Sequence, residues 1–121
     1  MYVQGFIVPV PADKKDAYRE VADKFWPIAR DFGCIGHVEA WEADVKDGQW
    51  TDFRKAVDLK EGEKVVFSWM TWPDKQTADE AHEKMMSDER MKEWGDGSDM
   101  PFDGKRMVFG GFEVIVDNAV L

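Results

Sequence analysis

The hydrophobic and polar residues of this chain follow two periods, and each change of period marks the boundary of an element. Four runs are dense in β-branched and aromatic residues and predict strands, whereas two runs repeat their apolar residues at steps of three and four, as one face of a helix requires. The strands are expected at residues 2–10, 34–44, 64–72 and 105–116, and the helices at residues 13–33 and 74–95. The order β-α-β-β-α-β favours an α+β fold, with one four-stranded antiparallel sheet and both helices on one face.

Local signals modify the two helices. Pro27 lies inside the first helical pattern and has no N–H to donate, so we expect a kink or an early end there. The second helix follows Pro73, which ends the third strand. It has two candidate N-terminal caps, which are Asp74 alone or Thr77 with Glu80 three residues on.

The irregular segments carry turn signals. Residues 45–62 lose their period and predict a long connection, in which the amphipathic stretch 53–59 is typical of a short helical turn. Its apolar plug consists of Phe53, Val57 and Leu59. In the last strand, the pair Gly110 and Gly111 indicates a bulge.

Three of the strands are apolar on both faces, although a face in contact with water would alternate with polar residues. The residues that carry this pattern are Phe6, Val8 and Ile7 in the first strand, Phe67, Trp69, Val66 and Met70 in the third, and Val108, Phe112, Phe109 and Ile115 in the last. Because the helices cover one face only, we expect a second copy of the sheet to cover the other in a closed homodimer. The alternative is a monomer with an open, ligand-binding sheet.

Length and charge narrow the class of protein. A chain of 121 residues has the size of one domain, so we expect a single domain over residues 1–121. The acidic formal charge of -9 opposes binding to nucleic acid and to anionic membrane surfaces, and we expect neither partner. The lone cysteine, Cys34, together with the lack of a secretory signal and of a long apolar run, favours a cytoplasmic protein.

Several stretches carry a resemblance that extends over nearly the whole chain. They are residues 2–11, 65–69, 86–91 and 110–113 and, most specific of all, Met-Pro-Phe-Asp-Gly-Lys-Arg-Met at 100–107. In these stretches the chain resembles the YbaA-like proteins, a bacterial family classed as domain of unknown function family 1428 within the dimeric α+β barrel superfamily. The resemblance implies a ferredoxin-like protomer and a barrel dimer. It implies no activity and supplies no catalytic residues.

His37 and Glu39 are the first candidates for chemistry. They lie two positions apart on one strand face, so their tips could share a proton or a metal ion. The alternative is a hydrogen-bonded pair without chemistry, in a barrel interior or on an edge strand. Because a metal site normally needs three or four ligands and the chain has 2 histidines, we expect no metal.

The turn at Asp103, Lys105 and Arg106 places one carboxylate and two cations beside a strand start. An arginine fork could hold a carboxylate or enolate, so Lys105 and Arg106 are candidate ligand-binding residues and Asp103 is a candidate catalytic residue. The alternative is that Asp103 shapes the turn and a cation pairs with an acidic residue of the partner subunit. Glu113 lies on an otherwise apolar strand and is either a general base, if burial raises its pKa, or a rim residue.

Trp69 is a further candidate ligand-binding residue. Relatives in the wider barrel group that degrade haem place a histidine on the second helix and a tryptophan on the third strand, positions that His82 and Trp69 could match. No longer motif supports haem, and no nucleotide-binding glycine motif occurs, so we expect no cofactor. Cys34 is most simply a small buried hydrophobe.

Two functions remain open at this point. One is a small-molecule-binding dimer with its ligand between the sheet and its helices, and its catalytic form would be a cofactor-free enzyme of the isomerase or monooxygenase kind. The other is a non-catalytic homodimeric module whose aromatic and acidic surfaces bind another protein.

Overall fold

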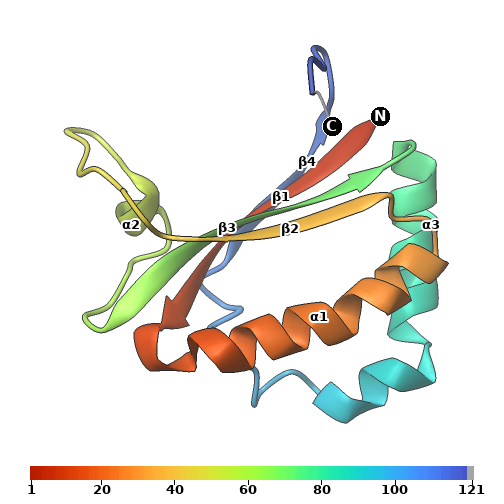
Figure 1. The fold of residues 1–121 in the computed structure, drawn as a ribbon, viewed down its shortest axis with the longest axis horizontal. Helices are drawn as coiled ribbons and strands as arrows, with labels where there is room; N and C mark the ends of the chain where they lie inside the picture. The colour runs from red at the N-terminus through yellow and green to blue at the C-terminus, as the bar shows by residue number, and fades with distance from the viewer. Residues whose placement is uncertain (120–121) are drawn as a thin grey trace.

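The computed structural model describes residues 1–119 and contains the elements in the predicted order (Figure 1). The strands are β1 (Tyr2–Pro11), β2 (Gly36–Trp41), β3 (Glu63–Trp72) and β4 (Val108–Glu113). The helices are α1 (Lys15–Asp31), α2 (Phe53–Ala56) and α3 (Lys75–Met86), and two 3₁₀ helices are η1 (Ala12–Lys14) and η2 (Glu89–Trp94). The predicted α+β class is confirmed.

The four strands form one antiparallel sheet in the order β2-β3-β1-β4. The central strands β1 and β3 pair along their whole length, from Tyr2 opposite Trp72 to Pro11 opposite Glu63. In Figure 1, α1 and α3 lie together on one side of the sheet, while the short α2 lies on the other. The prediction that both main helices cover one face is therefore correct.

The core lies between the sheet and these two helices. Every second residue of β1 and β3 points toward the helices, as the two-residue period of a strand requires. The buried residues of this layer are Val8, Val10, Tyr18, Ile28, Ala29, Cys34, Val66, Met70, Trp72, Ala78, Ala81 and Met85. The indole N–H of Trp72 donates to Gln4 Oε1 at 2.9 Å, so this buried ring also satisfies its polar atom.

The opposite side of the sheet, here called the open face, is apolar and largely uncovered. The strand register puts Val38, Phe67, Trp69, Ile7, Val108 and Phe112 on it. Four of these side chains, Val38, Phe67, Val108 and Phe112, are 40%, 46%, 42% and 62% exposed. Monomeric proteins rarely leave a contiguous apolar surface of this kind in water. The sequence pattern of strands that are apolar on both faces is thus present in the fold.

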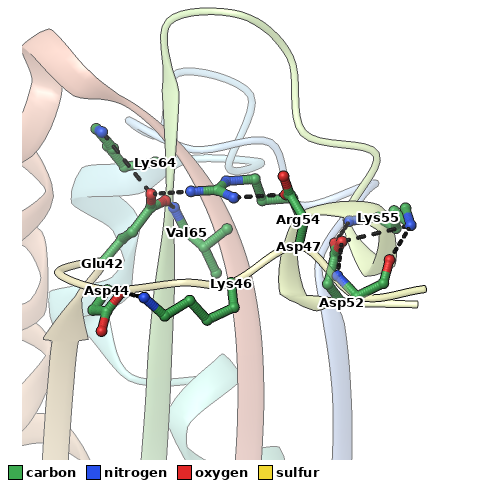
Figure 2. Close-up of polar contacts among 10 residues, drawn as sticks. Glu42, Asp44, Lys46, Asp47, Asp52, Arg54, Lys55, Lys64 and Val65 are labelled. Carbon is green, nitrogen blue, oxygen red and sulfur yellow. Dashed lines mark hydrogen bonds and ion pairs between the residues drawn. The ribbon is translucent and has the colours of Figure 1, made fainter. Parts of the chain in front are cut away.

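Charged side chains hold the connection between β2 and β3 (Figure 2). Arg54 lies between two carboxylates, with Nη2 3.1 Å from Glu42 Oε2 and Nη1 3.0 Å from Asp47 Oδ1. Glu42 also accepts a hydrogen bond of 2.9 Å from the backbone N–H of Val65. Because the side chain of Glu42 is 8% exposed, these partners offset its loss of water. The connection is therefore anchored to β3.

The same connection carries the short helix predicted near residue 53. The carboxylate of Asp52 caps α2 by accepting from the backbone N–H of Lys55 at 2.7 Å (Figure 2). Val57 is buried, whereas Phe53 stays half exposed and packs edge-on against Phe67, with ring centroids 5.9 Å apart. Of the predicted plug, Phe53 therefore contacts the open face and Val57 is buried.

The second main helix is shorter than predicted. α3 begins at the Asp74 cap, whose Oδ1 accepts from Thr77 N–H at 2.7 Å, and ends at Met86 instead of near residues 94–95. Asp88 then caps a new start by accepting from the N–H of Arg90, so the chain continues as η2 in another direction. The apolar residues of α3 and η2 both face the core, so the sequence pattern reads as one continuous helix.

Several strand and helix ends also differ from the prediction. Cys34 does not begin β2, because its N–H closes the end of α1 by donating to Ala29 O at 3.0 Å. β4 spans six residues instead of 105–116, since Lys105 and Arg106 belong to the preceding turn. α1 runs through Pro27 to Asp31 and does not end early.

The predicted bulge at Gly110 and Gly111 is absent from the described sheet. β1 and β4 pair without interruption, with Gly5 opposite Gly110 and Gln4 opposite Gly111. Gly111 instead leaves room for the Tyr2 ring, which lies where a Cβ atom would be. Gly111 thus reflects a close side-chain approach and not an extra residue.

Candidate functional site

Two adjoining cavities lie on the helix-covered side of the sheet. The polar cavity, about 320 Å³ in volume, runs between α1 and the edge strand β2 and is lined by Lys15, Tyr18, Arg19, Ala22, Asp23, His37, Glu39, Trp41 and Val66. The apolar cavity, about 240 Å³, is lined by Phe6, Val8, Tyr18, Val21, Ala22, Phe25, His37, Glu39, Ser68, Met70, Met91, Trp94, Met100, Phe102 and Met107. Tyr18, Ala22, His37 and Glu39 line both cavities, so these residues form the boundary between them.

Glu39 is the centre of this boundary. Its Oε1 accepts a hydrogen bond of 2.5 Å from the phenol of Tyr18, and its Oε2 lies 2.6 Å from His37 Nε2 and accepts from Ser68 Oγ at 2.9 Å. The side chains of His37 and Glu39 are 9% and 24% exposed. We call Tyr18, His37, Glu39 and Ser68 the Glu39 cluster.

Each member of the cluster reaches it for a simple geometric reason. His37 and Glu39 alternate on β2 and therefore share its helix-covered face. Ser68 lies directly opposite Glu39 in the β2–β3 register, where side chains of an antiparallel pair contact each other. Tyr18 comes from the buried side of α1. The expected convergence of His37 and Glu39 is thus seen, with two further partners.

Tyr18 acts in this cluster as a donor. Burial, reinforced by the negative charge of Glu39 and by the hydrogen bond to it, raises the pKa of the Tyr18 phenol above its usual value. The phenol therefore keeps its proton at neutral pH, and Glu39 is the acceptor in their hydrogen bond. Tyr18 was not among the candidate residues predicted from the sequence, because its spacing along α1 is that of a packing residue.

The ring of His37 is fixed by two aromatic neighbours. Trp26 stacks on it with ring centroids 6.1 Å apart, and Phe25 meets it edge-on at 6.3 Å. This packing holds Nε2 against the carboxylate of Glu39. A carboxylate and an imidazole in direct contact beside an apolar cavity can bind a donor group of a ligand, or can exchange a proton with it.

Arg106 lies apart from the Glu39 cluster and is occupied by partners within the chain. Its Nη1 and Nη2 contact the two carboxylate oxygens of Glu63 at 2.9 and 2.7 Å, and its Nε contacts Asp103 Oδ2 at 2.8 Å. Nη1 also donates to the backbone carbonyl of Asp58 at 2.9 Å. The alternative predicted for this turn was an ion pair between one of its cations and an acidic residue of the partner subunit. Arg106 does form ion pairs, but its acidic partners, Glu63 and Asp103, belong to the same chain. Lys105 is exposed beside it.

The remaining candidates lie at separate places. Trp69 is on the open face, where its ring contacts that of Phe67 at 5.5 Å between centroids. His82 is exposed on α3, which packs on the opposite side of the sheet, so the two haem-type positions do not meet. Glu113 is exposed at the end of β4. Cys34 is buried, and burial raises the pKa of its thiol, as expected of an inert core residue.

Among residues 1–119, His, Cys, Asp and Glu side chains do not gather in groups of three or more as metal ligands would. No helix within these residues is sufficiently long and apolar to cross a membrane.

Comparison with known proteins places the chain in a family. The family model described as "Protein of unknown function (DUF1428)" matches residues 1–104. The chain is 60% identical over 116 residues to "Uncharacterized protein YbaA" of Escherichia coli strain K12, and this alignment covers 96% of this chain and 97% of that protein. The identity to YbaA of Shigella flexneri is the same. A solved dimeric ferredoxin-like protein from an uncultured marine organism shares the fold with a TM-score of 0.62, at 10% identity over 98% of each chain. The resemblance read from the sequence is confirmed, and the chain belongs to the YbaA-like family of proteins of unknown function, DUF1428.

Proposed function

We propose that this protein is a homodimer that binds a small molecule, with the apolar part of the ligand in the apolar cavity and a polar group of the ligand at the Glu39 cluster. The observation that carries the proposal is that a hydrophobic cavity wall and a cluster of hydrogen-bonded polar side chains meet in one site. Apart from Tyr18 and the other cluster members, the side chains that line the apolar cavity are hydrophobic or aromatic. Small-molecule sites typically combine an apolar lining with a few convergent polar groups.

The dimer is supported by the open face. Its exposed Phe67 and Phe112 lie on the side of the sheet away from α1 and α3, where a second sheet could pack against them. The solved neighbour is described as dimeric, and we extend that state to this chain by analogy of fold. Two sheets that meet across a two-fold axis would form the α+β barrel and leave both cavities of each protomer outside the interface.

A catalytic role would use Glu39 as the proton acceptor. Its carboxylate faces the apolar cavity, and His37 lies 2.6 Å away, where it could share the proton that Glu39 receives. This arrangement fits a cofactor-free isomerase better than a metal-dependent reaction. The free thiol of the single Cys34 fits the reducing cytoplasm.

Native mass spectrometry of the untagged protein tests the proposal. A dimer of the 13.9 kDa chain should carry an extra mass that is lost on denaturation. In Glu39→Gln the bound fraction should fall about tenfold or more, because one charged acceptor is removed from the site while its shape is kept. Glu113→Gln is the matched control, since it removes the same charge from an exposed position on β4 and should keep the ligand.

Other outcomes of this experiment count against the proposal. A ligand retained equally by both variants would remove Glu39 from the site. A clean dimer without extra mass would favour the non-catalytic interaction module, for which the 88% exposed ring of Trp50 is the strongest sign. A clean monomer would contradict the role given to the open face.

A further inference from the structure

The polar cavity holds two cations at one end. Lys15 and Arg19 are four residues apart on α1, so they lie on the same side of the helix, and both line the cavity together with Trp41 of β2. The Lys15 ammonium lies over the Trp41 ring, 5.3 Å from its centroid. Both cations are also near the N-terminal end of α1, where the helix dipole adds further positive potential.

Neither cation has a carboxylate partner within 4.0 Å among residues 1–119. Within residues 1–119, Arg19 is the arginine without a carboxylate oxygen inside 4.0 Å, whereas Arg30, Arg54, Arg90 and Arg106 each have one. Lys15 likewise forms no ion pair among the described residues, and its recorded contact is with Trp41. The contrast therefore lies with Arg19, since other lysines of the described chain, such as Lys84 and Lys105, also form no ion pair.

Like charges four residues apart on a helix also repel each other, so the pair is unfavourable unless something neutralises it. Asp23 lines the same cavity but forms no ion pair within 4.0 Å with either cation in the described chain. Glu39 lies two residues before Trp41 on the same face of β2, and its carboxylate already accepts a hydrogen bond from Tyr18. The end of the cavity at Lys15 and Arg19 therefore presents two cations without a carboxylate of the described chain inside 4.0 Å, although Asp23 and Glu39 also line the cavity.

We infer that this end of the polar cavity binds the anionic group of the ligand, and that the ligand is an organic carboxylate whose apolar body extends past the Glu39 cluster into the apolar cavity. The inference rests on the proposed function, since it assigns the ligand class of that same site. An arginine fork matches a carboxylate in shape and charge, and Trp41 supplies a flat apolar wall beside it. Asp23 and Glu39 in the same lining favour a singly charged group over a doubly charged phosphate.

Matched probe pairs test this assignment. The probes are 2-naphthoate with 2-naphthamide and 4-phenylbutyrate with 4-phenylbutyramide, because each pair differs in the charge and keeps the apolar body. Binding is measured by calorimetric titration of the intact protein at low salt. We expect at least one carboxylate to bind about tenfold more tightly than its amide, and to lose that advantage as salt is raised.

Variants of the two cations locate the effect. Lys15→Gln and Arg19→Gln should each weaken the binding of the carboxylate about tenfold and leave the binding of the amide unchanged. Lys84→Gln is the matched control, because this substitution changes the net charge by the same amount. Lys84 is exposed on α3 and forms no ion pair among the described residues.

The outcomes separate the two proposals. Equal affinity for a carboxylate and its amide would overturn the anion site and leave the small-molecule site standing. An equal loss of both probes in Arg19→Gln, or the same loss in Lys84→Gln, would also overturn it, because the effect would then not arise from contact with the charge. If no probe binds, the anion site is overturned and the proposed small-molecule site is contradicted for ligands of this class.

Discussion

Arg106 links three segments of the chain through its hydrogen bonds and ion pairs, so it contributes to the stability of the fold. It joins the turn before β4 to the start of β3, through Glu63, and to the connection that precedes β3, through the carbonyl of Asp58. We expect Arg106→Ala to lower the free energy of unfolding by about 2 kcal/mol, because it leaves the largely buried carboxylate of Glu63 without its cation, at a cost reduced by partial exposure. Chemical denaturation checks this value, with Lys105→Ala, an exposed neighbour, as the control that should change little.

The same pair predicts a pH dependence. In the folded chain the hydrogen bonds from Arg106 are the main cause that holds the pKa of Glu63 below its ordinary value of 4.5. A lowered carboxylate pKa stabilises the folded state above the unfolded pKa, and this contribution is lost as pH falls through the folded pKa. The difference in stability between the wild type and Arg106→Ala should therefore be full at pH 7 and shrink below about pH 4. A difference that stays constant down to pH 3 would contradict this assignment.

Among the elements, β4 offers a test of why its two glycines are there. A Cβ on Gly111 would collide with the Tyr2 ring, which packs on the core, whereas a Cβ on Gly110 would meet the Phe112 ring at 3.6 Å, an ordinary contact. We expect Gly111→Ala to cost roughly 1–2 kcal/mol of folding stability, since the ring must leave its packing. Gly110→Ala should be neutral or stabilising by up to about 1 kcal/mol, because alanine restricts the unfolded chain. Thermal unfolding of both variants distinguishes this explanation from a bulge, for which both positions would be sensitive.

The elements were predictable because their periods are local, whereas their ends and partners were not. The backbone N–H groups of Phe32, Gly33 and Cys34 all close the end of α1, so Cys34 belongs to this helix end and not to β2, which no period reveals. His37 and Glu39 could be paired from their two-residue spacing. Ser68 could not be added to them, because its position depends on the β2–β3 register. The partner of Arg106 lies 43 residues away in the chain, so sequence spacing gave no sign of it.

On the scale of the whole molecule, the sheet separates two surfaces of different chemical character. The helix-covered side contains both cavities and the Glu39 cluster. Among residues 1–119, the open face has no comparable polar cluster, and its apolar residues extend from the α2 connection across all four strands. Because the two surfaces lie on opposite sides of one sheet, a homodimer through the open face would leave the ligand site accessible. Association and ligand binding should therefore be separable by mutation.

Phe112 and Phe109 allow this separation to be tested on a single strand. Phe112 is 62% exposed on the open face, and Phe109 is 68% exposed but points to the other side of β4, so the two differ in direction and little in exposure. We expect Phe112→Asp to shift the mass in solution toward the 13.9 kDa monomer, because a charge would have to be buried in the interface. Phe109→Asp should remain dimeric. Sedimentation equilibrium measures both masses, and circular dichroism verifies that each variant is folded. A folded Phe112→Asp that stays as dimeric as Phe109→Asp would place the subunit contact elsewhere than on the open face.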